Sequence, residues 1–570
     1  MAGGDGNLGT SRPIHALGIN YYDHDSAVAL ARDGRIIFAI AEERLSRQKK
    51  DSSFPHRSLQ AALDHAGIEF RDLDQICFGW QRPGASFAHD LKCHLDGSVP
   101  TTATYLVNSA RRCVREVWQN GGAKLMEGRF GSPARPVQFV DHHRAHALSA
   151  FIVSGFSEAA VMIVDGRGAW EATTLWRAGA GDCALVSSHA HPDSLGYFYA
   201  AFTKFLGFRP YSDEWKVMGL APYGKPGVDL SRFISVNGEG YRVASRKVIG
   251  RRFGDVSAIA DEFGPPRVAE SEITERDKDI AWAVQERCEE AMLGVARSIV
   301  ARTGLRKLCL AGGVAMNSKA NGKILASGVI DEIFVQPAAT DDGTAIGAAL
   351  AAHRLAGGAP APYRLDEVYL GPEFGEKEIE SFLRTCKIPF TRPADIAVEG
   401  ASLLAAGKII GWFQGRMEFG PRALGNRSIL ADPRDPEMKD RVNAVVKFRE
   451  GWRPFAPSCL AEKAHEYFIG CTDSPFMILT FPVKEEMKRV IPAVTHADGS
   501  ARVQTVRRDV NPLYHALISH FERLTGVAVV MNTSYNLREE PIVCAPKDAV
   551  RTFYSSGLDA LCIGPFLVTK

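Results

Sequence analysis

Short apolar runs that end in turns rich in glycine and aspartate recur along the first 355 residues. Examples are AAVMIVDGRG at 159–168, KLCLAGGVAMN at 307–317 and EIFVQPAATDDG at 332–343. Such runs are typical of buried strands, and longer segments with helical patterning, such as 278–303, lie between them. The alternation predicts an α/β domain over residues 1–355. Its start predicts a β-meander, with Asp33-Gly34 as the turn between two strands.

A second domain is expected because a chain of 570 residues is too long for one ordinary core. The stretch GGAPAPYRLDEVYLGPEF is rich in glycine and proline, which predicts a linker over 356–375. New helical and strand patterns follow it, including EKEIESFLRTC and KIIGWFQG. We therefore expect a second α/β domain over 376–570.

Composition excludes several classes of protein. The 68 Lys and Arg residues nearly balance the 66 Asp and Glu residues, so the net charge of +2 gives no general reason to expect a nucleic-acid partner. The sequence contains no apolar run long enough to span a membrane and no signal peptide, which predicts a cytoplasmic protein without a membrane partner. Eleven cysteines without a CxxC spacing favour free thiols over a zinc ribbon. Composition leaves the oligomeric state open.

The segment DHHRAHA places two histidines, His142 and His146, four residues apart at the start of a predicted helix. This spacing puts both imidazoles on one helix face, where they can share a metal, although pairs of exposed histidines are also common. The zinc protease pattern HExxH is disfavoured because His143 stands where the catalytic glutamate would be. A metal site here needs carboxylates from elsewhere.

Candidate carboxylates follow two of the apolar strands. Asp165 opens DGRG, and Asp341 and Asp342 precede GTAIGAAL. Simple capping of a helix is the alternative role for the aspartate pair. Histidines combined with carboxylates form a mixed nitrogen and oxygen site, which suits iron, manganese or zinc better than magnesium.

Several glycine-containing turns predict a nucleotide cleft assembled from loops. Backbone N–H groups in such turns can point at an anion. Lys216 is equally compatible with a solvated surface position. The candidate nucleotide-binding residues are Gly166, Gly168, Lys216, Gly312, Gly313 and Asn317.

The early turn NYYDHDSA carries Asp23, His24 and Asp25. A plain turn is one interpretation, because Asn and Asp favour turns. A histidine between two carboxylates has a stabilised imidazolium form, which makes the triplet a candidate for general-base catalysis or cation binding.

Basic residues crowd short segments of the second domain beside glycines and prolines. A solvated basic face would explain such charge, but arginine forks in glycine-bounded turns fit a small phosphorylated substrate better. GPRALGNRS is not a P-loop, because Asn426 and Arg427 replace the Lys and Ser/Thr of that motif. The candidate pocket residues are Arg422, Lys447, Arg453, Arg502, Asn532 and Ser534.

Seven motifs, in order, resemble the carbamoyltransferases of antibiotic and nodulation-factor biosynthesis. They are HDSA, DHHRAHA, VDGRG, KVMGLAPYG, AGGVAMN, DDGTAIGAA and RMEFGPRALGNRSILADPR, and they span nearly the whole chain. The resemblance implies an N-terminal Kae1-like domain of the actin/hexokinase/Hsp70 type and a C-terminal YrdC-like α/β domain. It implies an O-carbamoyltransferase that forms carbamoyladenylate from carbamoyl phosphate and ATP, with ATP used as its Mg²⁺ complex.

The resemblance also assigns roles to residues. Fe²⁺ is the implied metal, with His142, His146, Asp165 and one of Asp341 and Asp342 as ligands. Relatives of the Kae1 type favour Asp341, whereas the glycine directly after Asp342 favours Asp342, which is the ligand we expect. The implied carbamoyl phosphate and adenylate pocket contains the six residues of the second domain named above.

The resemblance implies that the acceptor is a hydroxyl of an aminoglycoside antibiotic such as tobramycin, and an acidic turn such as YDHDSA suits such a polycation. Carbamoyladenylate is unstable and would be hydrolysed if it were released, so we expect an internal channel between the domains. The runner-up is a tRNA-modifying transferase with the same two activities, but the net charge offers little for an RNA backbone. An ATP-switched binding protein of the Hsp70 type is the non-enzymatic alternative, and an arginine pocket has no use in it.

Overall fold

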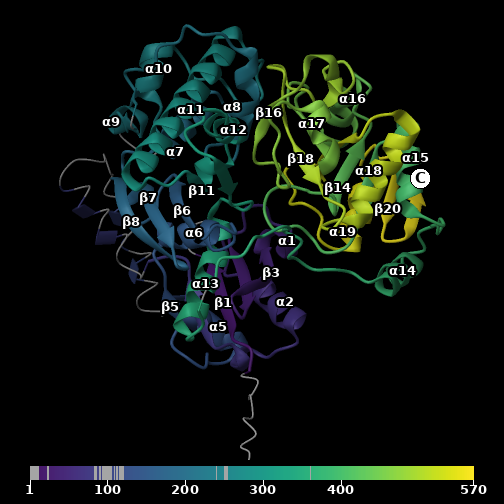
Figure 1. The fold of residues 1–570 in the computed structure, drawn as a ribbon, viewed down its shortest axis with the longest axis horizontal. Coiled ribbons are helices and arrows are strands. Elements are labelled where there is room, and N and C mark those ends of the chain that lie inside the picture. Colours follow the sequence, from purple (N-terminus) through teal and green to yellow (C-terminus); the bar gives the residue numbers. More distant parts are fainter. Residues whose placement is uncertain are drawn as a thin grey trace, which may run out of the picture.

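The structure of the protein is a computed structural model that describes residues 12–21, 25–81, 121–238, 240–249, 254–359 and 361–570, with isolated positions between 87 and 114. Two α/β parts lie side by side, with the N-terminal part in purple to teal and the C-terminal part in green to yellow (Figure 1). Asp23 and His24 lie outside the described residues.

The first sheet has the strand order β3-β2-β1-β4-β5. Strands β1 to β3 form an antiparallel meander, and β4 and β5 continue the sheet parallel to β1. The predicted turn at Asp33-Gly34 is confirmed, because both residues have positive φ angles, 49° and 78°. The strands are β1 (His15–Asn20), β2 (Ala27–Arg32), β3 (Arg35–Ala41), β4 (Gln75–Phe78) and β5 (Gln138–Phe139).

The second sheet repeats this arrangement. Its order is β12-β11-β6-β7-β8, with an antiparallel meander of β6 to β8 and with β11 and β12 parallel to β6. Two sheets of the same order and direction are the architecture of the actin/hexokinase/Hsp70 type, so the fold class predicted for the N-terminal part is confirmed. The strands are β6 (Glu158–Val164), β7 (Glu171–Gly179), β8 (Asp182–Ala190), β11 (Lys307–Ala311) and β12 (Glu332–Val335).

Helices α6 (His142–Phe151) and α13 (Thr344–Leu355) pack between the two sheets at very close range. A Cβ atom on Gly347 of α13 would lie 1.8 Å from the carbonyl oxygen of Ala145 in α6. A Cβ atom on Gly18 of β1 would lie 2.0 Å from the carbonyl oxygen of Ala345. Glycine at these positions lets three backbones meet, which brings the start of α6 next to the start of α13.

Other helices cover the outer faces and build the upper lobe of the N-terminal part (Figure 1). The longest, α11, has a capping box between Thr274 and Asp277 and ends at Gly304 with φ 72°. No helix among the described residues has the length and apolar character needed to cross a membrane. The helices are α1 (Glu42–Ser46), α2 (His56–Ala66), α5 (Gly121–Phe130), α7 (Leu195–Phe205), α8 (Glu214–Leu220), α9 (Ser245–Val248), α10 (Ser257–Phe263), α11 (Glu275–Thr303) and α12 (Ser318–Ala326), with a small hairpin of β9 (Ile234–Asn237) and β10 (Gly240–Val243).

The C-terminal part is built on one mixed sheet of seven strands, in the order β18-β15-β19-β14-β13-β20-β21. Its core contains the fully buried Trp412, Tyr514 and Tyr535. The strands are β13 (Ile410–Phe413), β14 (Arg427–Ala431), β15 (Ala456–Leu460), β18 (Gln504–Val506), β19 (Val529–Ser534), β20 (Ala560–Ile563) and β21 (Phe566–Thr569), and β16 (Thr480–Pro482) pairs with β17 (Ser500–Arg502) beside them. The helices are α14 (Glu376–Thr385), α15 (Ile396–Ala405), α16 (Met438–Val442), α17 (Ala464–Tyr467), α18 (Pro512–Thr525) and α19 (Pro546–Tyr554).

The segment predicted as a linker packs against both parts of the molecule. Leu365 N donates to the carbonyl of Val153 at 2.8 Å, and Gly371 N donates to that of Met417 at 2.9 Å. Leu365 and Leu370 are buried in the large core of the N-terminal part. This differs from the loose tether that a glycine- and proline-rich stretch suggests, because its apolar side chains have a core to enter.

Candidate active site

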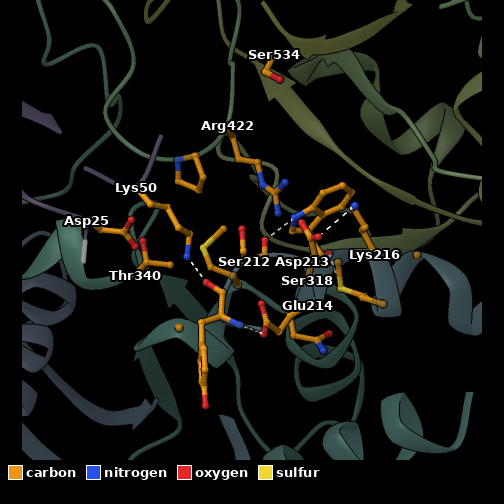
Figure 2. A pocket seen from close by; sticks show the side chains of 18 of the residues that line it. Asp25, Lys50, Ser212, Asp213, Glu214, Lys216, Ser318, Thr340, Arg422 and Ser534 are labelled. Atoms are coloured by element: carbon orange, nitrogen blue, oxygen red, sulfur yellow. Dashed lines mark hydrogen bonds and ion pairs between the residues drawn. The ribbon is translucent and has the colours of Figure 1, made fainter. Parts of the chain in front are cut away.

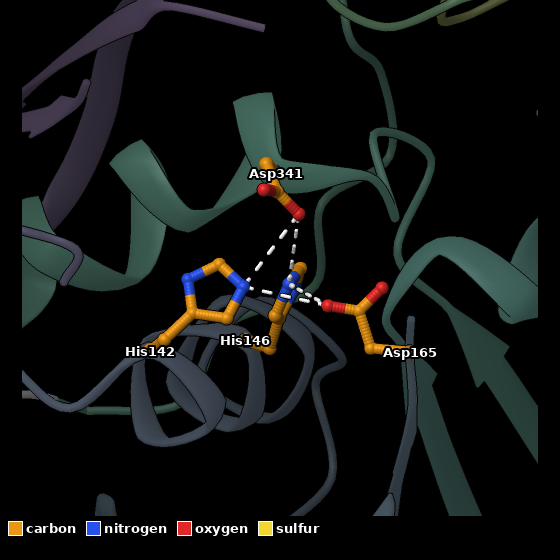
Figure 3. Close-up of side chains that lie close together, drawn as sticks. All are labelled: His142, His146, Asp165 and Asp341. Carbon is orange, nitrogen blue, oxygen red and sulfur yellow. Dashed lines mark ion pairs between the residues drawn. The ribbon is translucent and has the colours of Figure 1, made fainter. Parts of the chain in front are cut away.

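Four buried side chains form a candidate metal centre (Figure 3). His142 and His146 come from α6, Asp165 follows β6, and Asp341 begins a 3-10 turn, Asp341–Gly343, that leads into α13. All four lie at carboxyl ends of strands or just beyond them, where the two sheets meet. Each offers one ligand atom, and these atoms lie within 4.8 Å of one another.

The distances within this group suit one shared ion. His142 Nε2 lies 3.4 Å from Asp165 Oδ2 and 3.6 Å from Asp341 Oδ1. His146 Nε2 lies 3.8 Å and 3.7 Å from the same two atoms. Four ligands at about 2.1 Å from an ion lie about 3.4 Å apart in a tetrahedron. The group is therefore close to the size that a divalent transition metal requires.

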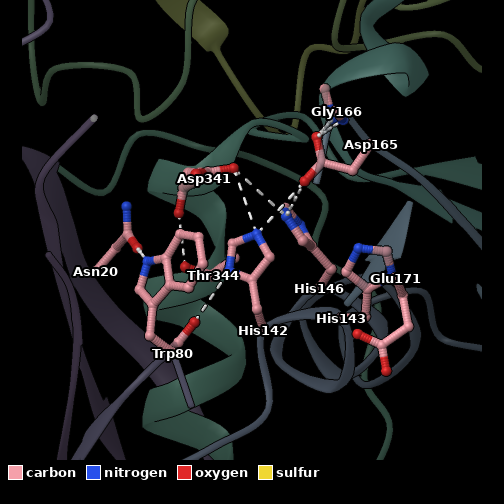
Figure 4. A network of polar contacts seen from close by, with 12 residues as sticks. Asn20, Trp80, His142, His143, His146, Asp165, Gly166, Glu171, Asp341 and Thr344 are labelled. Carbon is pink, nitrogen blue, oxygen red and sulfur yellow. Dashed lines mark hydrogen bonds and ion pairs between the residues drawn. The ribbon is translucent and has the colours of Figure 1, made fainter. Parts of the chain in front are cut away.

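The orientation of His142 also fits a metal ligand (Figure 4). Its Nδ1 lies 3.1 Å from the carbonyl oxygen of Gly79, and its ring stacks on Trp80 with centroids 4.0 Å apart. The Nε2 atoms of His142 and His146 are buried without a hydrogen-bond partner in the described part of the chain. A carbonyl on Nδ1 holds the proton there and leaves Nε2 free to bind a cation.

Electrostatics distinguish the two neighbouring histidines. Burial disfavours charge on His142, but Asp341 and Asp165 outweigh burial and raise the pKa of His142 well above its usual value. Burial lowers the pKa of His143 to about 3, and its Nδ1 lies 2.9 Å from the Thr174 hydroxyl. His143 therefore faces a hydroxyl in the core, whereas His142 faces the carboxylates.

Asp341, and not the expected Asp342, lies in the candidate metal centre. Asp342 Oδ1 instead accepts hydrogen bonds from Thr340 Oγ1 at 2.6 Å and from Gly343 N at 3.0 Å. Burial and the charge of Asp25 raise the pKa of Asp342 to about 7. Successive residues of a 3-10 turn point in different directions, and Asp341 is the one of the pair whose carboxylate faces both histidines.

The predicted nucleotide-binding residues divide into two groups. Gly166, Gly168, Lys216, Gly313 and Asn317 line a cavity between the two parts of the molecule. Gly312 is not among its lining residues, and a Cβ atom there would lie 2.4 Å from the carbonyl oxygen of Val164. With its φ of 90°, Gly312 permits close backbone packing.

Two of the lining residues also have local partners. Asn317 caps α12 by accepting from Ala320 N at 3.1 Å, and it exchanges hydrogen bonds of 3.0 Å with Gln285. Lys216 Nζ lies 3.2 Å from Asp213 Oδ2 (Figure 2). These contacts orient both side chains at the cavity wall.

The cavity has a volume of about 1010 Å³, and all six predicted pocket residues of the C-terminal part line it. Figure 2 shows Arg422 pointing into it, and Lys50, Asp213 and Lys216 also line it. Asp165, Asp341 and Asp25 line the same cavity. One continuous space therefore connects the candidate metal centre with the basic residues of the other part.

The basic residues form a cluster of like charges, which we call the arginine cluster: Arg422, Lys447, Arg449, Arg453 and Arg502. The Nε atoms of Arg422, Arg453 and Arg502 are buried without a hydrogen-bond partner among the described residues. Burial lowers the pKa of Arg422 to about 10, and burial together with Arg422 and Arg449 lowers that of Arg502 well below its usual value. Such a cluster can bind an anion, which would accept hydrogen bonds from the unpartnered Nε atoms and neutralise the repulsion between the buried cations.

The remaining pocket residues are held by hydrogen bonds. Lys447 Nζ contacts the backbone and hydroxyl oxygens of Ser534 and lies 2.8 Å from Asn536 Oδ1. Asn532 Nδ2 donates to Ser458 Oγ at 3.0 Å and to Gln504 Oε1 at 3.1 Å. These contacts fix the base of the pocket.

The prediction missed Arg449 and Trp215. Arg449 completes the arginine cluster, and Trp215 lies under the Arg453 guanidinium at 3.9 Å. The spacing KFREGWR contained a signal for Arg449, because it lies between two predicted pocket residues. Trp215 gave none, since it reaches the cluster from the other part of the molecule.

Comparison with known proteins agrees with this architecture. The family model described as "Carbamoyltransferase N-terminus" matches residues 15–350, and "Carbamoyltransferase C-terminus" matches residues 401–570. An uncharacterized protein of Synechocystis is 39% identical, with 98% of this chain and 97% of that protein covered. Nodulation protein NolNO of Sinorhizobium fredii is 40% identical, with 97% and 80% covered, and nodulation protein NolO of Bradyrhizobium diazoefficiens is 43% identical, with 76% and 79% covered.

Among solved structures, component A of the (R)-2-hydroxyglutaryl-CoA dehydratase of Acidaminococcus fermentans is 15% identical, with a TM-score of 0.32 and with 60% of this chain and 99% of that chain covered. The two family models together match most of the described chain, and they place the metal centre and the arginine cluster in different matched regions. The chain belongs to the carbamoyltransferase family.

Proposed function

We propose that the protein is an ATP-dependent O-carbamoyltransferase whose two half-reactions occur at two ends of one cavity. The observation that carries the proposal is that a single space of about 1010 Å³ is lined by the arginine cluster and by Asp165 and Asp341 of the candidate metal centre. A labile intermediate formed at one end can reach the other within this one space.

In the first half-reaction the arginine cluster binds carbamoyl phosphate and the phosphates of ATP. Water first cleaves the P–O bond of carbamoyl phosphate, which releases phosphate and leaves carbamate with its C–O bond intact. A carbamate oxygen then attacks the α-phosphorus of ATP and displaces pyrophosphate. The products are carbamoyladenylate, pyrophosphate and phosphate. Arg422 and Arg502 can grip phosphoryl oxygens bidentately, and their burial strengthens each contact.

In the second half-reaction the carbamoyl group passes to an acceptor hydroxyl and AMP leaves. His142, His146, Asp165 and Asp341 would hold a divalent transition metal, with Fe²⁺ as the expected ion, and that metal would supply Lewis acidity. Glycines 166, 168 and 313 let the backbone approach the adenylate. Asp25, on the cavity wall, directly follows Asp23 and His24 in the sequence, and we propose this triplet as the acceptor of the hydroxyl proton.

The acceptor that we propose is a polycationic aminoglycoside such as tobramycin. The N-terminal wall of the cavity carries charges of both signs, with Lys49, Lys50 and Arg209 among its carboxylates. The carboxylates that could bind the ammonium groups of a polyamine are Asp25, Glu43, Asp51, Asp213 and Glu214. The arginine cluster lies on the C-terminal wall, where it would bind the anionic substrate.

The proposal is tested by incubating the full chain and Fe²⁺ with Mg·ATP, carbamoyl-labelled carbamoyl phosphate and a panel of acceptors. We expect pyrophosphate release that depends on carbamoyl phosphate and label in an aminoglycoside, with neutral polyols and tRNA as comparison acceptors. Absence of carbamoyl-dependent pyrophosphate would refute the first half-reaction. Labelled tRNA with unlabelled aminoglycosides would assign the transfer to RNA modification instead.

A further inference from the structure

We infer that Arg44, in the N-terminal part, is a positioning residue for Arg422 in the C-terminal part. The inference rests on the proposed function, because it concerns how the pocket for carbamoyl phosphate is assembled. It means that the first half-reaction depends on a side chain from the part of the molecule that carries the metal centre.

Arg44 lies on α1, is 7% exposed and lines the cavity, so direct contact with a substrate is the alternative role that the double variant below has to exclude. Its guanidinium donates through Nη2 to the carbonyl oxygen of Gly420 at 3.0 Å, across 376 residues of chain. Its Nε lies 3.4 Å from Glu43 Oε1, which orients the guanidinium from the side of α1. A buried charged donor on a carbonyl is a strong contact, and its loss leaves that carbonyl without this donor.

The Gly420 carbonyl is well placed to control Arg422. It belongs to the peptide bond that precedes Pro421, and proline fixes its own φ angle. Gly420 itself has a φ of 111°, a conformation that glycine adopts freely and that needs external contacts to be kept. A contact that fixes this carbonyl therefore fixes the direction in which the chain enters Arg422.

The far side of the same loop is held from within the C-terminal part. The buried Glu418 accepts through Oε1 from Leu424 N at 2.7 Å, Asn426 N at 2.8 Å and Arg427 N at 3.1 Å. Glu418 thus fixes the backbone after Arg422 by accepting hydrogen bonds, and Arg44 fixes the backbone before it by donating one. Arg422 lies in the chain between these two supports, and its Nε has no hydrogen-bond partner among the described residues. Its side chain points into the cavity (Figure 2).

The end of α1 also contacts a second wall of the pocket. Arg47 donates to the carbonyls of Ile542 at 2.6 Å and Pro541 at 2.7 Å, and both of these residues line the cavity. Gly420 lies against the segment that leads to Asp341, since a Cβ atom there would be 3.2 Å from the Pro337 carbonyl oxygen. The arginine cluster is therefore shaped by a surface of the N-terminal part.

The decisive measurement is the steady-state rate of carbamoyl-dependent pyrophosphate release by Arg44→Ala in the full chain. We expect the KM for carbamoyl phosphate to rise about tenfold, equivalent to about 1.4 kcal/mol, with a smaller change in kcat. Transfer from supplied carbamoyladenylate should stay within about threefold of wild type, because that step does not use the grip of Arg422 on phosphate. Arg44→Lys keeps a donor and should recover part of the KM.

A double variant separates positioning from a general structural effect. If Arg44 acts through Arg422, adding Arg44→Ala to Arg422→Ala should change the KM less than about twofold further. Arg416→Ala is the matched control, because Arg416 donates to the carbonyls of Ile37 and Leu370 across the same interface but does not line the cavity. It should leave the KM near wild type.

Three results would overturn the inference: an unchanged KM in Arg44→Ala, equal losses in both half-reactions and in thermal stability, or full additivity with Arg422→Ala. The proposed function fails separately, through absence of carbamoyl-dependent pyrophosphate with the wild-type protein. Circular dichroism and a melting curve on Arg44→Lys keep the inference testable if Arg44→Ala does not fold.

Discussion

The two ends of the cavity differ in the charge of the ligand that they need. At the metal centre, two histidines and two carboxylates face one another within 4.8 Å, so one cation satisfies all of them. In the arginine cluster, like charges face one another, and three buried Nε atoms lack a partner among the described residues. The first end needs a resident ion, whereas the second needs the charge of a substrate.

This difference predicts how each end responds to the loss of a side chain. Removal of a metal ligand should be visible in the resting protein as lost metal. Removal of a cluster arginine should be visible only when anionic substrates are present, and should not reduce the stability of the resting protein.

The largest effect is expected from Arg422→Ala. Loss of this guanidinium should lower kcat/KM for carbamoyl-dependent pyrophosphate release by about 100-fold or more, or about 2.7 kcal/mol. The melting temperature should be unchanged or higher, because the variant removes a buried cation whose pKa burial lowers to about 10. Arg384→Ala is the control, because the Arg384 side chain on α14 is 68% exposed. A large loss of stability with intact activity would show that Arg422 stabilises the resting protein and does not bind the anionic substrate.

The next effect concerns His142 and its neighbour. His142→Ala should weaken Fe²⁺ or Zn²⁺ binding by at least about 100-fold, beyond the 10–100-fold typical of residues that only support ligands. His143→Ala is a matched control, because His143 is equally buried but lies 2.9 Å from the Thr174 hydroxyl. The measurement is metal affinity by competition with a chelator. Equal losses in both variants would argue against a centre defined by the α6 face.

A finer comparison separates the two adjacent aspartates. Asp341→Asn should weaken metal binding about tenfold or more, because it removes a charged ligand, whereas Asp342→Asn keeps the oxygen that accepts from Thr340 and Gly343. Metal content after dialysis against a weak chelator measures the difference. If Asp342→Asn lost more metal, Asp342 would be the ligand.

Local pattern was enough to predict much of this arrangement. The sequence predicted that Asp165 and the aspartate pair follow strand ends. Because the carboxyl ends of parallel strands meet at one edge of a sheet, these carboxylates could be expected near one another. The i, i+4 spacing of His142 and His146 needed only a helix. The ordered β-meander likewise followed from alternation and an Asp-Gly turn.

Other features of the site could not be predicted from the sequence, because they depend on tertiary packing or on the direction in which a turn points each side chain. The direction of Asp341 relative to Asp342 is set by a 3-10 turn that the letters DDG do not specify. Gly312 and Gly313 look alike in sequence, yet Val164 packs against only the first of them in the described structure. The contact of Arg44 with Gly420 joins residues 376 positions apart, which no local pattern encodes.

The smallest effect is expected from a paired charge at the cavity rim, Lys319, which contrasts with the buried and unpartnered Nε atoms of Arg422 and Arg502 in the described part of the chain. Lys319 of α12 forms an ion pair with Asp498 of the C-terminal part. Burial alone would raise the pKa of Asp498, but Lys319 lowers it to about 2. Because the folded pKa lies below the ordinary value of 3.8, the pair stabilises the folded state above pH 3.8, and this is lost as the pH falls towards 2.

We expect Asp498→Asn to reduce the free energy of unfolding near neutral pH by about 1 kcal/mol, since partial exposure screens the pair. The difference from wild type should shrink as the pH falls below 4, which urea unfolding at a series of pH values would measure. Lys319→Met should have the same pH dependence, and the double variant should add little, because both remove one interaction. An undiminished difference at pH 2 would show that Asp498 stabilises through packing, and the contrast between paired and unpaired charges would then not extend to the rim.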